Sequence, residues 1–413
     1  MAKRILAIIL IYAVTSAAWM MLGGLTHERT QSARRSMEGR VAELWGTSHR
    51  QTAPEIYYVE DADGAATPAA PTVRPPEKPA PGAEQRRRVE LIPEASNIKV
   101  GFHLDQRRKG LLWFSTYSVA FDGTYTVKNT TSAPRDITVA FALPTSEAIY
   151  DDLQFYAGES PVEGSAASQG RLATTLSLSP GESRDVRVAY RSRGLDNWAY
   201  AFGKGATQVK NFLLEMTTDF KAIDFPGRTI SPSTKEEIPG GWRLVWDHKN
   251  LISGFMVGME MPKRLNPGPL ASQISFFAPV SLLFFFFVIF ILCVVRDIRL
   301  HPMHYFFLAA AFFSFHLLFA YLVDHTDVNL AFALASLTSV ALVVSYLAAV
   351  VGQSFAYREA AAAQVIYLVL FSYTHFFTGF TGLSVTIVAI LTLAAAMRLT
   401  AHIDWDQKFR GGA

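Results

Sequence analysis

The chain has 413 residues, of which 50% are hydrophobic and 18% are charged, and its mean hydropathy is +0.19. This balance argues against a purely soluble protein, because soluble domains typically carry about 25% charged residues. The net charge of +3 comes from dispersed side chains, so it gives no reason to expect a nucleic-acid partner. The apolar excess lies after residue 270, since residues 271–397 hold only seven charged side chains.

Six segments are apolar enough to cross a bilayer, which requires about 20 such residues in a helix. They are residues 5–25, 274–295, 303–323, 328–351, 361–374 and 382–397, of which the last two are short. The pattern predicts a polytopic α-helical membrane protein with about six transmembrane helices. A large extramembrane segment separates the first helix from the second.

The positions of the basic residues predict the orientation of these helices, because Lys and Arg in short loops stay on the cytoplasmic side. With six crossings, one side of the membrane receives Lys3, Arg4, Arg296, Arg299, Arg358, Arg398, Lys408 and Arg410. We therefore expect both termini in the cytoplasm of a bacterium, the chain in its inner membrane, and the segment 26–269 in the periplasm.

The first apolar segment has two interpretations. Small residues at 15–18 resemble a signal-peptide cleavage site, but the apolar run of about 21 residues is longer than a usual signal sequence. An uncleaved anchor over residues 1–25 is the favoured interpretation. Whether the segment is cleaved stays open.

The extramembrane part divides into a helix, a linker and a β-rich region. Residues 26–60 contain a predicted juxtamembrane helix that ends at Gly46, and residues 61–88 form a linker rich in Pro and Ala that we expect to be disordered. Residues 89–269 alternate apolar and polar side chains in short runs, which predicts a sandwich-like β domain. Predicted strands are residues 117–127, 137–142, 212–216, 242–246 and 255–261, with a loop at 129–134. Residues 172–178 and 186–190 are predicted to form a hairpin around a turn at 179–182. A bundle of five helices follows at 270–398, and a cytoplasmic tail at 399–413.

No catalytic or cofactor motif is present, so the sequence predicts neither catalytic residues nor a cofactor. The single cysteine, Cys293, lies in an apolar run, and His301 with His304 makes a poor ligand set, so no metal site is expected. Two adjacent acidic pairs, Asp151–Asp152 and Glu236–Glu237, are interpreted as solvated loop charges rather than a hydrolase site.

Two sets of polar residues in the membrane half are candidates for function. His316 lies in mid-span, where an ionisable residue is costly, although a hydrogen bond between helices is the simpler explanation. Asp324, His325, Asp327 and Asn329 gather between the third and fourth helices, where they are also suited to capping a short loop. No acidic residue lies at the centre of a predicted span, which disfavours proton-coupled transport.

Motifs along most of the chain resemble the CreD family of inner-membrane cell-envelope integrity proteins. In the first half they are Gly24-Leu25-x-x-Glu28-Arg29, Val41-Ala42-x-x-Trp45-Gly46, Gln51-x-x-Pro54, Leu91-Ile92-Pro93-Glu94, Arg107-Arg108-Lys109-Gly110-Leu111 and Tyr117-Ser118-Val119. In the membrane half they are His301-Pro302-x-x-Tyr305, Asp324-His325-x-x-x-Asn329-Leu330-Ala331, residues 346–352, and Leu399-Thr400-x-x-Ile403-Asp404-Trp405. The linker departs from the family pattern, as does Asp324, which stands where a Glu is expected.

The resemblance implies a non-enzymatic protein that supports envelope integrity and responds to cell-wall stress, including β-lactams. We expect it to act by binding or sensing through its periplasmic domain. Its partners would be the lipid bilayer and an unidentified periplasmic or inner-membrane envelope protein, and a homo-oligomer is left open. A small-molecule or lipid transporter is the alternative. The candidate functional cluster comprises Asp324, His325, Asn329, His316, Asp404 and Trp405.

Overall fold

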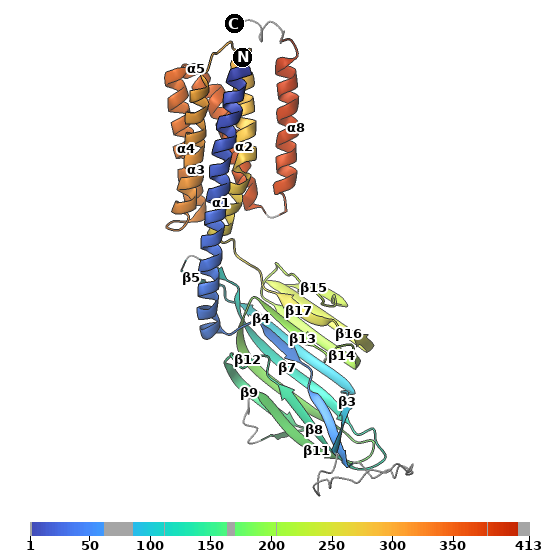
Figure 1. Cartoon of the computed structure of the whole chain (residues 1–413). Coiled ribbons are helices and arrows are strands. Elements are labelled where there is room, and N and C mark those ends of the chain that lie inside the picture. The colour runs from blue at the N-terminus through green and yellow to red at the C-terminus, as the bar shows by residue number, and fades with distance from the viewer. Residues whose placement is uncertain are drawn as a thin grey trace, which may run out of the picture. The chain divides into compact units, whose positions relative to one another are not determined.

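The computed structural model describes residues 2–61, 86–110, 112–162, 170–203, 205–377 and 379–403 (Figure 1). The chain divides into two compact units. The helical unit comprises Met1–Met37, Gly110–Leu112 and Leu265–Ala413, and the β unit comprises Glu38–Lys109 and Trp113–Arg264. The predicted β-rich region in the middle of the chain is therefore confirmed.

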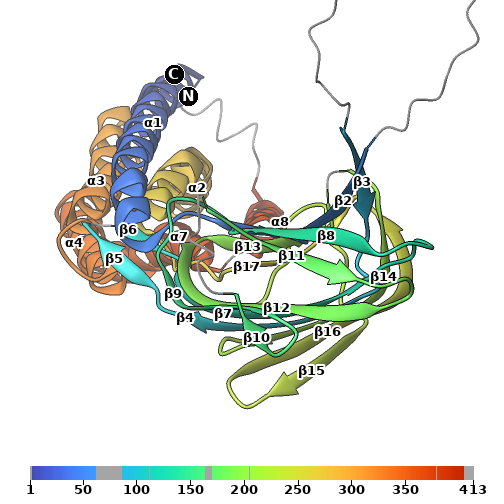
Figure 2. The same cartoon turned by 90° about the horizontal axis from the view of Figure 1, so that it is seen from below.

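The β unit is built from two layers of strands (Figure 2). Among the described residues, one layer is an eight-stranded sheet in the order β10 (Ser160–Pro161), β9 (Tyr150–Ala157), β12 (Ser183–Leu195), β7 (Thr116–Lys128), β4 (Ala95–Leu104), β14 (Thr207–Thr218), β16 (Gly241–Ser253), β15 (Thr234–Ile238). Its neighbouring strands are antiparallel, apart from the parallel pair β4 and β14.

The facing layer combines two smaller sheets. In the described residues these are β11 (Arg171–Leu178), β8 (Arg135–Ala142), β2 (Glu55–Asp61), β3 (Arg86–Leu91), and β1 (His49–Thr52), β13 (Asn197–Ala201), β17 (Met256–Glu260). A short pair, β5 (Arg107–Lys109) and β6 (Leu112–Phe114), completes the strands.

The core lies between the layers because alternate residues of each strand point inward. Along β7, Val119, Phe121, Tyr125 and Val127 are all buried. Phe121 of the eight-stranded sheet lies 6.0 Å, between ring centroids, from Phe141 of β8 in the other layer. The period-two pattern thus produces a sandwich with an aromatic core.

The predicted hairpin of residues 172–178 and 186–190 is wrong. β11 pairs with β8, whereas β12 pairs with β7 and β9 in the opposite layer. The turn at 179–182, where Gly181 has φ +76°, carries the chain from one layer to the other. Alternation identified both strands, but it does not identify the partner of a strand.

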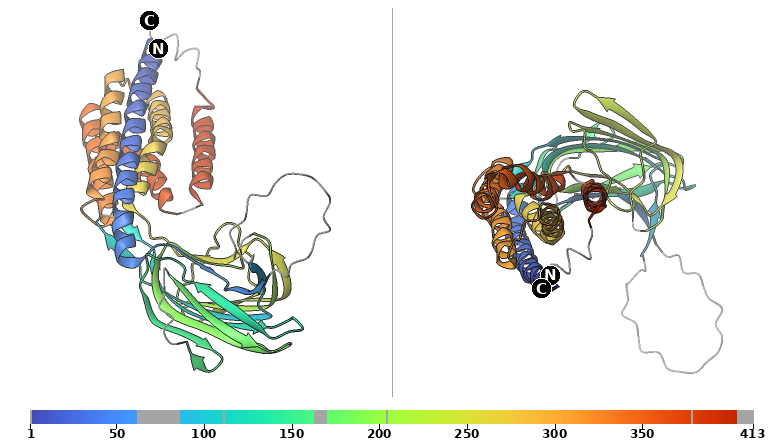
Figure 3. Two further views of the ribbon diagram at one scale, coloured as in Figure 1. Left: turned by 60° about the horizontal axis from the view of Figure 1, so that its bottom comes forward. Right: turned by 90° about the horizontal axis from the view of Figure 1, so that it is seen from above.

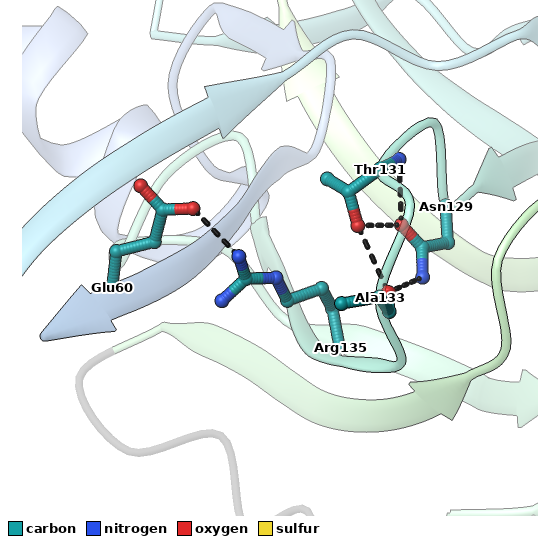
Figure 4. Close-up of polar contacts among 5 residues, drawn as sticks. All are labelled: Glu60, Asn129, Thr131, Ala133 and Arg135. Carbon is teal, nitrogen blue, oxygen red and sulfur yellow. Dashed lines mark hydrogen bonds and ion pairs between the residues drawn. The ribbon is translucent and has the colours of Figure 1, made fainter.

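The loop between β7 and β8 is held by one buried side chain, Asn129 (Figure 4). Its Nδ2 donates to the carbonyls of Ala133 (2.8 Å) and Leu178 (2.9 Å), and its Oδ1 accepts from the backbone N–H of Thr131 (2.9 Å). Beyond the loop, Arg135 forms an ion pair with Glu60 at 2.8 Å. The predicted loop at 129–134 is confirmed, and an Asx-type network fixes its shape.

The first helix, α1 (Ala2–Trp45), is a continuous 44-residue helix, about 66 Å long at 1.5 Å per residue. The anchor and the juxtamembrane helix are therefore one element. It ends where predicted, because Gly46 adopts φ +81° and donates its N–H to the carbonyl of Ala42 at 2.8 Å.

The remaining helices belong to the helical unit (Figure 3). α2 (Pro267–Val295), α3 (Pro302–Leu322) and α4 (Val328–Val350) each present a buried face to a common core. α8 (Thr381–Thr400) packs against α2. Among the described residues, five helices are long and apolar enough to cross a membrane: α1, α2, α3, α4 and α8.

The segment predicted as the fifth span, residues 361–374, lies within a longer helical run of mixed geometry. Its parts are α5 (Gln353–Phe355), π-helical η1 (Ala356–Ala360), α6 (Ala361–Gln364), π-helical η2 (Val365–Leu370), α7 (Phe371–Tyr373) and 3₁₀-helical η3 (Thr374–Phe376). Of the predicted linker at 61–88, Asp61 ends β2 and Arg86–Arg88 begin β3; residues 62–85 lie outside the described residues.

Candidate functional site

An ion pair joins α1 to the end of α3. The guanidinium of Arg29 lies 2.8 Å from the carboxylate of Asp324, whose side chain is 17% exposed. Arg29 also donates to the carbonyl of Ala320 at 3.1 Å, and its Cζ lies 5.4 Å from the ring centroid of Tyr321. The structure thus gives Asp324, a predicted site residue, a specific partner.

The sequence explains why Arg29 binds there. α3 ends at Leu322, so the carbonyls of its last turn lack partners within the helix and carry partial negative charge. An arginine has enough donors to bond a carboxylate and a carbonyl together. Arg29 therefore neutralises Asp324 and caps α3 at the same time.

The other predicted loop residues have different environments. The carboxylate of Asp327 accepts the N–H groups of Asn329 (2.9 Å) and Leu330 (3.4 Å), so Asp327 is the N-cap of α4. His325 and Asn329 are exposed, and within the described residues their side chains make no hydrogen bond. Capping accounts for Asp327, while Asp324 is held by α1.

His316 lies in the core of the helical unit, 1% exposed, and not with Asp324. The two residues are eight positions apart in the chain, which corresponds to about 12 Å along a helix axis. Its Nδ1 lies 3.3 Å from the carbonyl of Phe312, and its ring contacts those of Trp19 (5.7 Å) and Phe315 (4.9 Å). Asp404 and Trp405 lie outside the described residues.

Sequence reasoning did not identify Arg29 as a site residue. Arg29 follows the apolar segment 5–25, and Asp324 follows the apolar segment 303–323. Because both segments are predicted to span the membrane, these positions indicate that the two residues lie near a membrane face. The choice of partner depends on the packing of α1 against α3, which Trp19 makes through Phe312 and Phe313. Spacing along the chain does not reveal that packing.

A pocket of about 640 Å³ opens in the β unit, a volume typical of small-molecule sites. Its aromatic floor comprises Tyr200 of β13, Phe202, which directly follows β13, and Phe212 of β14. Between ring centroids, Tyr200 and Phe202 lie 5.9 Å apart, and Phe202 and Phe212 lie 4.9 Å apart. The hydroxyl groups of Tyr200 and Tyr125 lie 3.3 Å apart, and burial raises the pKa of Tyr200, so the floor stays neutral.

The rim of this pocket is polar. Glu55 accepts from Arg88 (3.1 Å) and Arg171 (2.6 Å). Burial opposes ionisation of Glu55, but its two arginine partners outweigh that effect and hold its pKa below the usual value. Arg50 and Glu90 also line the pocket. The pocket is suited to a ligand with an apolar body and polar edges.

At the end of α1, the ring of Trp45 contacts two arginines of the β unit. The Cζ atoms of Arg107 and Arg193 lie 3.7 Å and 4.8 Å from its ring, and Arg107 is held by Asp105 at 2.7 Å. Each such cation–π contact is worth about 0.5–1 kcal/mol when exposed. The last residue of α1 is therefore fixed to β5 and β12.

The acidic pairs lie in strands, so the expectation of loop charges is wrong. Asp151 and Asp152 belong to β9, and Glu236 and Glu237 to β15. Asp152 pairs with Arg191 at 3.2 Å, and the two glutamates pair with Arg243 and Lys221. No group of three or more potential metal ligands gathers in the part of the chain that the structure describes.

These features define a membrane protein that combines an apolar helical unit with a β sandwich. The model of the family described as inner membrane protein CreD matches residues 272–406, which confirms the predicted resemblance to the CreD family. No curated protein matches. Among solved structures, a chain from Legionella pneumophila, provisionally titled a nutrient binding protein, is 13% identical over 46% of this chain and 74% of its own, with a TM-score of 0.29.

Proposed function

We propose that this CreD-like chain is an inner-membrane protein that supports cell-envelope integrity and the response to cell-wall stress, including β-lactam exposure. It acts by binding or sensing through the β unit and not by catalysis. The ion pairs of Asp152, Glu236 and Glu237 support the second point, because a carboxylate neutralised by a neighbouring cation is a poor general base.

In the proposed topology the chain crosses the membrane six times, with residues 353–376 as the fifth crossing. The basic residues Arg4, Arg296, Arg299, Arg358 and Arg398 support an orientation with both termini in the cytoplasm. The β unit is then periplasmic, where it reaches an envelope partner.

One observation carries the proposal: α1 is held at two places. Arg29 binds Asp324 at the end of α3, and Trp45 makes cation–π contacts with Arg107 and Arg193 of the β unit. We propose that α1, which runs from the helical unit into the β unit, passes a change in the bound β unit to the helices. The pocket over Tyr200, Phe202 and Phe212 is the proposed binding site for a ligand or a segment of the partner.

The proposal is tested by survival of a deletion strain under β-lactam, detergent and osmotic challenge. We expect deletion to sensitise the cells and plasmid-borne wild type to restore them, whereas an Asp324→Asn/His325→Ala variant does not. Unchanged survival under all three challenges would contradict the proposal. Transport of a small molecule or lipid in reconstituted vesicles would then be the next activity to measure.

A further inference from the structure

Two basic side chains, Arg4 and Arg299, lie at the end of the helical unit where α1 begins. Arg4 of α1 and Arg299 of the α2–α3 loop line one shallow pocket of about 430 Å³, together with His301. Within the described residues no carboxylate pairs with either arginine, and the buried Nε of Arg4 has no hydrogen-bond partner. The nearby Arg296, by contrast, is paired with Glu359.

The third residue of this basic pocket also presents a donor. Nδ1 of His301 accepts the N–H of Met303 at 3.2 Å, so a neutral His301 carries its proton on Nε2. His301 is the N-cap of α3, whose N-terminus adds partial positive charge to the pocket. Two arginines, one imidazole N–H and a helix N-terminus make a site for an anion.

An apolar groove lies between α1 and α2, and one of its lining residues, Ile5, directly follows Arg4 of the basic pocket. Along α1 it is lined by Ile5, Ile8 and Ile9, which directly follow Arg4, and along α2 by Leu283, Phe287 and Phe290. The one polar side chain of its lining, Tyr12, donates its hydroxyl to the carbonyl of Pro279 at 3.1 Å. From Ile5 to Tyr12 the groove follows α1 for about 10 Å.

We propose that the basic pocket and the groove together bind one anionic phospholipid. Its headgroup phosphate lies against Arg4, Arg299 and His301, and the first part of an acyl chain lies in the groove between α1 and α2. Charge complementarity selects an anionic headgroup, and the apolar groove, whose residue Ile5 directly follows Arg4 in α1, selects a lipid over a free anion. This lipid site shares no residue with the Arg29–Asp324 contact. The proposal does not depend on which side of the membrane the termini occupy.

The test measures lipid retention by the purified full-length protein in detergent, using native mass spectrometry. Phosphatidylglycerol is compared with phosphatidylcholine of the same acyl chains. We expect the wild type to prefer phosphatidylglycerol by about tenfold or more, because its headgroup carries a net negative charge whereas the choline of phosphatidylcholine neutralises the phosphate. Each arginine near an anionic headgroup contributes about a fivefold gain. An Arg4→Gln/Arg299→Gln variant should lose the preference. Equal retention of both lipids by wild type, or an unchanged preference in the variant, would overturn the proposal.

Three further arms separate the alternatives. Arg398→Gln in α8 removes a basic residue at the same end of the helical unit but outside the pocket, and it should keep the preference. Leu283→Trp fills the groove and should lower retention of phosphatidylglycerol while Arg4 and Arg299 remain. Arg4→Lys/Arg299→Lys keeps the charge and should retain part of the preference, which excludes misfolding as the cause of a loss. Displacement of the lipid by inorganic phosphate at equal concentration would show an anion site without lipid selectivity and overturn the lipid assignment.

Discussion

Arg29 of α1 and Asp324 beyond α3 form an ion pair of 2.8 Å, and the same guanidinium bonds the carbonyl of Ala320. One side chain therefore joins the anchor helix to the end of a second helix. A double-mutant cycle with Arg29→Gln and Asp324→Asn should give a coupling free energy of about 1 kcal/mol, discounted because Arg29 is 44% exposed. The cycle is measured by unfolding in mixed micelles. Arg34→Gln on the same helix is the control, and purely additive single effects would show that the contact contributes no coupling.

Gly46 should tolerate no side chain, in contrast to Gly39. At Gly46 the backbone has φ +81°, and an added Cβ would lie 2.6 Å from the carbonyl oxygen of Arg193. We expect Gly46→Ala to destabilise the β unit by about 2 kcal/mol or more. Gly39 lies inside α1, and a Cβ added there would have no neighbouring atom within 4 Å. We therefore expect Gly39→Ala to stabilise the protein by up to about 1 kcal/mol. Hydrogen exchange of β1 and β12 measures the change in stability for both variants. Equal effects of Gly46→Ala and Gly39→Ala would contradict this prediction.

His49 should make the β unit sensitive to acid. Its ring is buried beside Tyr117 and Tyr150, and desolvation lowers its pKa to about 4, against a weaker opposite effect of the Arg193 carbonyl. In the unfolded chain the group titrates near 6.5, so the unfolded state takes up the proton first as the pH falls. The contribution of neutral His49 to the free energy of unfolding of the β unit is therefore fully present above pH 6.5. That free energy declines by about 3 kcal/mol as the pH falls towards 4.

The variant His49→Phe should remove most of that decline, as measured by hydrogen exchange of β1 at several pH values. His103, exposed and paired with Asp219, is the matched control, and His103→Asn should keep the decline. A decline of equal size in the His49 variant would assign the acid sensitivity to another group.

Filling the aromatic pocket should abolish function without unfolding the β unit. Thr207 lies at the start of β14 on the wall of the pocket, and Thr207→Trp places an indole inside it. Thr175→Trp, on the exposed side of β11, is the control. We expect loss of complementation in the deletion strain for the first variant alone. Full complementation by a folded Thr207→Trp protein would remove the pocket from the mechanism.

The sequence predicted those parts of the fold that local periodicity determines. Strands such as Thr116–Lys128 and helices such as Val328–Val350 follow from the spacing of apolar residues. The end of α1 at Gly46 follows from the conformational freedom of glycine. Pairing between strands was not predictable, as β11 and β12 show, because each has an inward apolar face that suits either layer.

The candidate site was predicted in part. Asp324 stands out as an acidic residue at a membrane face, and His316 as an ionisable residue in an apolar span. Their partners, Arg29 and Trp19, both belong to α1, which is far away in sequence and packs against α3 only in the folded chain. The mixed α and π geometry of residues 353–376 has no signature in apolar spacing, so its helical run was predicted too short.

The most direct test of the central claim is complementation of the deletion strain by a charge-exchange series at Arg29 and Asp324, scored as survival under β-lactam. We predict that Arg29→Asp and Asp324→Arg each fail to restore survival at wild-type protein levels, and that the double exchange restores much of it by re-forming the pair. Full restoration by either single variant would contradict a role for this contact in linking the β unit to the helices.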